Sequence, residues 1–188
     1  MDALDSLRAR VWLVPGVRPG KRHLVHPLNG RFHPVDQDAL ERLVESLAAR
    51  CDTGGVDYVL GFPEGGSIPA YAFARAARRP VVLASRLPLD VPGRIAFEEP
   101  HAVTGTTQYL YGLAPGHRVL IVEDELTNGH TALSAVAALR GAGIAVDQII
   151  TLFAIDHPGL WRRVKAAGVT VHVGLLLPPE LAPRPLDP

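Results

Sequence analysis

The sequence predicts an α/β fold, an open, mostly parallel, twisted sheet flanked by helices. Two observations predict it. Between residues 37 and 177, short aliphatic runs alternate with helical patterns of about ten residues, which is typical of βαβ units with parallel strands. Apolar residues make up 47% of the 188-residue chain and charged residues 20%, a balance that supplies a sizeable buried core. We divide the chain into a small N-terminal segment (1–36), an α/β core (37–177) and a proline-rich tail (178–188).

The elements of this core follow from local patterns. Helices are predicted from apolar residues at helical spacing or from alanine-rich composition, at residues 38–50, 67–78, 131–140 and 158–167. Asp38 and Glu41 have the spacing of a capping box at the first helix. Strands are predicted from short aliphatic runs, at residues 56–62, 80–85, 118–122, 147–155 and 169–177. Residues 86–106 show no period and contain several prolines and glycines, so we expect a long functional loop there.

Composition argues against several classes of protein. Lys plus Arg and Asp plus Glu both total 19, so the net charge is zero, which argues against a nucleic-acid-binding surface. No apolar run approaches the roughly 20 residues of a membrane-spanning helix, and the first residues lack a signal-peptide pattern. Cys51 is the only cysteine, so we expect a reducing, cytoplasmic environment. The eight histidines show no metal-ligand spacing.

The segment with the clearest chemistry is residues 123–131, which reads Glu-Asp-Glu-Leu-Thr-Asn-Gly-His-Thr directly after the predicted strand 118–122. Its second half is small and polar around a glycine and leads into a helix, so its backbone N–H groups are suited to a phosphate. Its first half is acidic and would repel phosphate. It suits sugar hydroxyls or a hard divalent cation instead. A solvated acidic turn before a capped helix is the alternative interpretation.

Other nucleotide-binding patterns are absent. The Walker pattern requires a lysine after its second glycine, and this turn has none. The Gly-x-Gly-x-x-Gly pattern of dinucleotide-binding folds follows none of the predicted strands. A strand end that binds a phosphorylated sugar is therefore the interpretation that we carry forward.

Residues 119–131 resemble the phosphoribosyl-pyrophosphate (PRPP) binding motif of type I phosphoribosyltransferases: an aliphatic strand, two acids, two variable residues and a Thr-Thr-Gly-Gly-Thr-like loop. The resemblance implies a type I phosphoribosyltransferase-like fold. It also implies that Glu123 and Asp124 hold the ribose hydroxyls and lie beside a PRPP-bound magnesium ion. The loop would hold the 5′-phosphate. The PRPP-binding residues implied in this way are Glu123, Asp124, Leu126, Thr127, Asn128, Gly129, His130 and Thr131.

The resemblance extends over residues 24–177. Residues 29–34 resemble the segment of the orotate branch that forms a hood over the base, so the N-terminal segment is expected to be a hood with Phe32 against the base. Asp156 stands where that branch has an acidic residue near the base. Residues 61–66 resemble the pyrophosphate loop, which often contains a non-proline cis peptide, and Gly65 replaces a basic residue of many relatives. The implied pyrophosphate-binding residues are Pro63, Glu64, Gly65, Gly66 and Arg86.

In the orotate and adenine branches a mobile loop covers the reaction, and in the orotate branch it brings a lysine to the pyrophosphate. The predicted loop 86–106 contains no lysine. Its available cations are Arg86 and Arg94, with His101 as a proton donor. The catalytic residues expected from the resemblance are thus Asp124, Glu123, Arg94 and Arg86.

The resemblance implies an enzyme that transfers the 5-phosphoribosyl group from PRPP to a nitrogen of a nucleobase or related heterocycle, either an orotate-like pyrimidine or a purine. Pyrophosphate is released, magnesium enters as the PRPP complex, and a homodimer is expected. The alternative is a PRPP-sensing regulator or binding protein that has the same fold without transferase activity. A third candidate, chemistry on a different phosphorylated sugar, follows from the fact that fold does not fix function.

Overall fold

The computed structural model describes residues 3–16, 22–99 and 107–183. Its centre is a five-stranded sheet in the order β4-β3-β7-β8-β9, with every neighbouring pair parallel. The strands are β3 (Tyr58–Gly61), β4 (Val81–Leu83), β7 (Val119–Leu126), β8 (Gln148–Ile155) and β9 (Thr170–Leu177). The helices that flank them are α2 (Gln37–Ala48), α3 (Ser67–Ala77), α4 (His130–Gly141) and α5 (Pro158–Ala167). The α/β fold with a mostly parallel sheet is confirmed.

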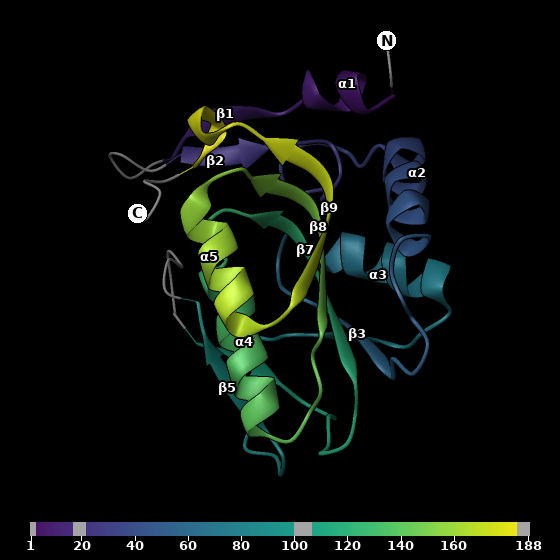
Figure 1. Ribbon diagram of the computed structural model, residues 1–188, viewed down its shortest axis with the longest axis vertical. Helices are drawn as coiled ribbons and strands as arrows, with labels where there is room; N and C mark the ends of the chain where they lie inside the picture. Colours follow the sequence, from purple (N-terminus) through teal and green to yellow (C-terminus); the bar gives the residue numbers. More distant parts are fainter. Residues whose placement is uncertain (1–2, 17–21, 100–106, 184–188) are drawn as a thin grey trace.

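The sheet separates two hydrophobic layers, as Figure 1 shows, with α2 and α3 on one face and α4 and α5 on the other. Alternation along β7 produces this division. Leu120 and Val122 pack in the cluster with α2 and α3, whereas Val119 and Ile121 pack in the cluster with α4 and α5. Because all four side chains are at most 1% exposed, β7 is the buried central strand of the molecule.

Smaller elements surround the carboxyl ends of these strands. In the N-terminal segment, α1 (Ala3–Arg8) precedes an antiparallel hairpin of β1 (Trp12–Pro15) and β2 (Arg22–Val25). A second antiparallel hairpin, of β5 (Ile95–Glu98) and β6 (Thr107–Leu110), packs beside α4. The described part of the tail contains a short 3-10 helix, η1 (Pro179–Leu181). Arg22 donates to the carbonyl oxygen of Ala182 at 2.9 Å and so joins the first hairpin to the tail.

Three local predictions were wrong. The N-cap of α2 is Asp36, whose side chain accepts from the Ala39 N–H at 3.0 Å, so Asp38 lies in the first turn and makes no capping box. Strand β7 continues to Leu126, four residues beyond the predicted end, because pairing with β8 continues along the acidic residues. The expected loop 86–106 contains β5, which pairs with β6 and buries Phe97. Of the described helices, none is long and apolar enough to cross a membrane.

Candidate functional site

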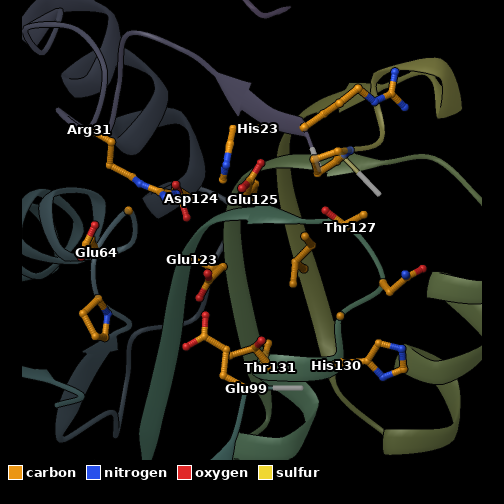
Figure 2. Close-up of a pocket in the computed structure, with 18 of the residues that line it drawn as sticks. His23, Arg31, Glu64, Glu99, Glu123, Asp124, Glu125, Thr127, His130 and Thr131 are labelled. Atoms are coloured by element: carbon orange, nitrogen blue, oxygen red, sulfur yellow. The ribbon is translucent and has the colours of Figure 1, made fainter. Parts of the chain in front are cut away.

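A cleft of about 290 Å³ lies at the carboxyl ends of β3 and β7, where ligands bind in open parallel sheets. Figure 2 shows its labelled side chains converging from several segments of the chain. One wall is the loop after β3, another is the end of β7 with the following turn, and a third comes from the N-terminal segment. The lining residues are Arg22, His23, Arg31, Pro63, Glu64, Gly65, Arg86, Glu99, Glu123, Asp124, Glu125, Leu126, Thr127, Asn128, Gly129, His130, Thr131, Ala132 and Pro183.

The turn after β7 and the start of α4, residues 127–131, form one half of the cleft, which we call the phosphate-binding half after the role that the resemblance implies. Gly129 is the N-cap of α4 and has a φ of +75°, a conformation that glycine adopts without steric cost. A Cβ at this position would approach the Leu160 side chain of α5 at 2.9 Å. The positive N-terminal end of the 12-residue helix α4 lines the cleft, an arrangement suited to an anion.

Helix α5 and its first turn brace this phosphate-binding half. Arg163 donates to the backbone oxygen of Asn128 at 3.0 Å and to its side-chain oxygen at 3.2 Å. The Nε2 atom of His157 lies 3.0 Å from the backbone oxygen of Thr127. All three contacts are made to oxygen atoms of the turn.

The acidic half of the cleft begins with Glu123, on β7. Burial of this carboxyl, together with the charges of Asp124, Glu125 and Glu99, raises its pKa well above the ordinary value of 4.5. Its Oε2 atom is buried and has no hydrogen-bond partner among the described residues. Such an atom is costly to hold in a folded protein unless a ligand completes it.

Asp124 has the opposite electrostatics. Burial alone would raise the pKa of its carboxyl, but hydrogen bonds from His26 and Asn29 and the charge of His26 outweigh burial and lower it. The Asn29 Nδ2 atom donates to Oδ2 of Asp124 at 2.8 Å, and Nε2 of His26 lies 3.6 Å from the same oxygen. Asp124 is thus a buried, ionised acid that is held from the N-terminal segment.

The loop after β3 also lies against Asp124. It contains a cis peptide between Pro63 and Glu64, the feature that the resemblance implied for the pyrophosphate loop. A Cβ at Gly65 would overlap the Asp124 carboxylate, with Cγ only 2.6 Å away. Position 65 therefore has no room for a side chain unless Asp124 moves, which explains the glycine at this position.

Arg86 reaches the cleft from the segment after β4, within a network of charges. Its guanidinium lies 3.6 Å from Glu64 and 3.2 Å from Glu99, the residue that follows β5. Glu99 also accepts from the buried Gln108 side chain at 2.7 Å. Arg86 therefore links the loop 63–65, through Glu64, to the segment that follows β5, through Glu99.

Four residues singled out in the sequence do not line the cleft. Arg94 donates to the backbone oxygen of Leu89 at 3.1 Å and lies over the ring of Tyr109. Phe32 is 43% exposed and contacts Arg31.

The other two residues that do not line the cleft are Asp156 and Gly66. The Asp156 carboxylate accepts from Trp161 at 2.8 Å on the exposed side of the β8–α5 turn. Gly66 directly follows the loop 63–65 and is the N-cap of α3. His101 lies outside the described residues.

The cleft is also lined by residues that the sequence analysis did not assign: Arg22, His23, Arg31, Glu99 and Glu125. Outside the lining, His26 and Asn29 contact Asp124, and Gln108 donates to Glu99. Asn29 and Arg31 belong to the segment 29–34 that the resemblance singled out. Glu125 is adjacent to the two motif acids. The remaining residues have no local signal, because their contacts form only when distant strands are assembled.

Comparisons with known proteins agree with this geometry. The family defined by the phosphoribosyl transferase domain matches residues 35–172. HGPRTase-like protein 3 of Haloterrigena turkmenica is 27% identical over 150 residues, 78% of this chain and 81% of that protein. A hypoxanthine/guanine phosphoribosyltransferase of Methanosarcina barkeri is 23% identical over 167 residues, 88% of this chain and 87% of that protein.

Solved structures give the same result for the fold. The adenine phosphoribosyltransferase of Rhodothermus marinus superposes with a TM-score of 0.72 at 26% identity, covering 93% of this chain and 98% of that one. The enzyme of Giardia lamblia complexed with 9-deazaadenine gives 0.75 at 19% identity, covering 94% and 99%. With a family match over most of its length and the same arrangement of sheet and helices, this chain belongs to the phosphoribosyl transferase family and has the type I phosphoribosyltransferase fold.

Proposed function

We propose that this protein is a PRPP-dependent phosphoribosyltransferase that transfers the 5-phosphoribosyl group to a ring nitrogen of a nucleobase. One observation carries the proposal: the helix-capping turn 127–131 and the paired acids Glu123 and Asp124 share one cleft with the loop 63–65. The turn suits a phosphate, the paired acids suit a pentose, and the loop suits a pyrophosphate. The family match and the named relatives support the same reaction class.

We propose a place in the cleft for each part of PRPP. The 5′-phosphate binds the N–H groups of residues 127–131 at the start of α4. The ribose hydroxyls bind the carboxylates of Glu123 and Asp124. The pyrophosphate then extends toward the loop 63–65 and Arg86, whose planar guanidinium suits a phosphate oxygen pair.

In the reaction, the bond between C1 of ribose and pyrophosphate breaks, and its electron pair leaves with the pyrophosphate. The base nitrogen forms the new bond to C1, and its proton passes to the leaving pyrophosphate or to water. The transition state resembles an oxocarbenium ion, as in glycoside chemistry. The protein contributes by holding both partners in line and by stabilising the leaving group with Arg86 and loop N–H groups.

The acids of the cleft are suited to a magnesium ion that arrives with the substrate. Among the described residues, no group of three or more His, Cys, Asp or Glu side chains is arranged to hold a metal ion alone. The unsatisfied Oε2 of Glu123 is a hard oxygen donor, so Glu123 and Asp124 fit beside an ion that takes its other ligands from PRPP and water. When bound, magnesium neutralises phosphate charge and stabilises the leaving pyrophosphate.

For the acceptor we propose a purine. The cleft is lined by five carboxylates and three guanidinium groups, those of Glu64, Glu99, Glu123, Asp124, Glu125, Arg22, Arg31 and Arg86. This excess of negative charge disfavours an anionic base such as orotate, because like charges repel strongly in a partly buried site. The named relatives are hypoxanthine/guanine and adenine phosphoribosyltransferases, all of which act on purines.

We also propose a cytoplasmic homodimer that binds no nucleic acid. The dimer proposal is supported by large exposed hydrophobic side chains that follow one another in α3, β4 and the segment after it, those of Ile68, Tyr71, Leu83, Leu87, Leu89 and Val91. The single cysteine supports the cytoplasmic location, and the zero net charge supports the proposal that the protein binds no nucleic acid. Sedimentation equilibrium tests the dimer: a protein that stays monomeric at micromolar concentration contradicts it.

The function is tested by incubating the protein with PRPP, magnesium and one base at a time, while pyrophosphate release is followed. The panel contains hypoxanthine, guanine, xanthine, adenine and orotate, and Asp124→Asn is the control for the site. We expect turnover with at least one purine and none with orotate. PRPP binding without turnover on any base contradicts the transferase and favours the PRPP-sensing regulator.

A further inference from the structure

We propose that Asn29 and His26 are positioning residues that fix the Asp124 carboxylate in the orientation that binds ribose. The inference rests on the proposed function, since it concerns how that cleft recognises the sugar. It goes further because it assigns a role in sugar binding to the N-terminal segment. The family resemblance of residues 29–34 associates that segment with the base instead.

The first argument is the arrangement of atoms at the carboxylate. Oδ2 of Asp124 accepts from Asn29 Nδ2 at 2.8 Å and lies 3.6 Å from His26 Nε2. His26, Asn29 and Asp124 are 0%, 3% and 3% exposed, so water does not compete for these contacts. Both donors address the same oxygen. The other oxygen, Oδ1, is therefore the one available to a ribose hydroxyl.

The second argument is that both donors are themselves fixed by the backbone. The Leu28 N–H donates to His26 Nδ1 at 3.3 Å, and His26 Nε2 lies 3.2 Å from Asn29 Nδ2, so the ring is held beside Asp124 at both nitrogens. The Arg31 N–H donates to Oδ1 of Asn29 at 3.1 Å, which fixes the amide with its NH₂ group toward Asp124. The His26 ring also packs on Phe153, with a centroid distance of 4.6 Å.

The third argument is steric. The Asp124 carboxylate also lies against Gly65, where even a Cβ would come within 2.6 Å of Cγ and would overlap Oδ2. The backbone at residue 65 and the side chains of Asn29 and His26 therefore confine the same carboxylate oxygen. Removing a donor frees it to rotate, and an incompletely paired buried carboxylate rotates toward any other polar group. The sugar then loses a preorganised acceptor.

The test uses ribose 5-phosphate and 2-deoxyribose 5-phosphate as probes, with their affinities measured by calorimetry on the full chain. These probes bind without turnover, so the result is independent of the acceptor base. We expect Asn29→Ala to weaken ribose 5-phosphate roughly tenfold, the effect of one hydrogen bond to a charged group. The preference for ribose over deoxyribose should shrink. Gln37→Ala, which truncates an exposed amide at the start of α2, is the matched control.

Two further variants separate positioning from a loss of fold. His26→Gln keeps a side-chain N–H donor and should retain most of the affinity, whereas His26→Leu should lose it. In an Asp124→Asn background, Asn29→Ala should have little additional effect, because Asn29 acts through Asp124. In turnover assays, the KM for PRPP should rise while the KM for the base stays constant.

Several outcomes overturn the inference. An Asn29→Ala protein that binds both probes like the wild type contradicts it, and so does an effect that is fully additive with Asp124→Asn. If Asn29→Ala does not fold, judged by circular dichroism, His26→Gln and His26→Leu decide the question, and equal losses in both contradict the inference. If the wild-type protein binds ribose 5-phosphate with the expected preference but turns over no base, the proposed reaction fails and the positioning role stands.

Discussion

The two halves of the cleft are built in different ways. The phosphate-binding half is a contiguous turn, residues 127–131, that presents backbone N–H groups at the start of α4. The acidic half is assembled from separate segments, since Asp124 meets Asn29 from 95 residues away and Gly65 from another loop. A backbone site depends on conformation and tolerates changes of side chain, whereas a site of side chains depends on each partner. The difference predicts where substitutions are damaging.

The largest effect is expected for Gly65→Ala. The new methyl group would overlap the Asp124 carboxylate, so the carboxylate must leave its position beside Gly65 and Asn29. We expect kcat/KM for PRPP to fall by roughly 100-fold or more, in the range of losses seen when a preorganised polar group is displaced. Steady-state kinetics checks this. Gly141→Ala is the control, because a Cβ at position 141 meets no atom within 4 Å.

The second large effect is expected for Glu123→Gln. This variant should be more stable than the wild type at pH 8 but should bind ribose 5-phosphate more weakly. The folded-state pKa of Glu123 is raised, so its carboxyl contributes stability that is fully present below about pH 4.5 and is lost as pH rises through the raised value. The neutral amide avoids this loss. We expect a gain of about 1 kcal/mol at pH 8, or about 2–4 °C in Tm.

The same variant should bind ribose 5-phosphate roughly tenfold more weakly, because a charged acceptor for a hydroxyl is lost. Thermal unfolding of wild type and variant between pH 4 and pH 8 measures the first effect, and calorimetry measures the second. A variant whose Tm falls at pH 8 would show that the Glu123 carboxyl is stabilised by groups of the folded protein. That result would contradict the electrostatics that we assign to this acid.

A smaller but selective effect is expected from the two arginines after β4. Arg86 lines the cleft between Glu64 and Glu99, whereas Arg94 is bound to a backbone oxygen outside it. We expect Arg86→Ala to lower kcat roughly tenfold or more and Arg94→Ala to change it less than about threefold, since of these two only Arg86 lines the cleft. Comparison of the two rates checks this. Equal losses would mean that the β5–β6 hairpin moves far enough to exchange their roles.

The sequence predicted the strand, turn and helix of the phosphate-binding half because all these parts are local. An aliphatic strand, a glycine with positive φ and a following helix occupy consecutive residues, and the helix boundary at residue 130 lies within one residue of the prediction. Periodicity predicted the buried strands and helices for the same reason. Each helix or strand carries its own pattern, whatever its neighbours in space.

The acidic half was predicted only in part, for a physical reason. Glu123 and Asp124 are adjacent in the sequence, but strand alternation directs them to different partners, and the length of β7 was set by pairing with β8. The contacts of Asn29 with Asp124 and of Arg86 with Glu99 form between segments that have no sequence relation. Likewise, β5 was missed because its stability comes from β6 and α4, which the sequence of 86–106 does not indicate.

The smallest effect is expected for His130→Ala, in the phosphate-binding half. The residue is the first of α4 and its side chain lines the cleft, yet the anion is expected to bind N–H groups, which every residue but proline supplies. Affinity for ribose 5-phosphate should change by less than about threefold, whereas the acidic-half variants lose roughly tenfold or more. Calorimetry on the same probe measures both, with the wild-type protein alongside. A loss for His130→Ala as large as that for Asn29→Ala would mean that both halves depend on side chains, and the comparison between them would fail.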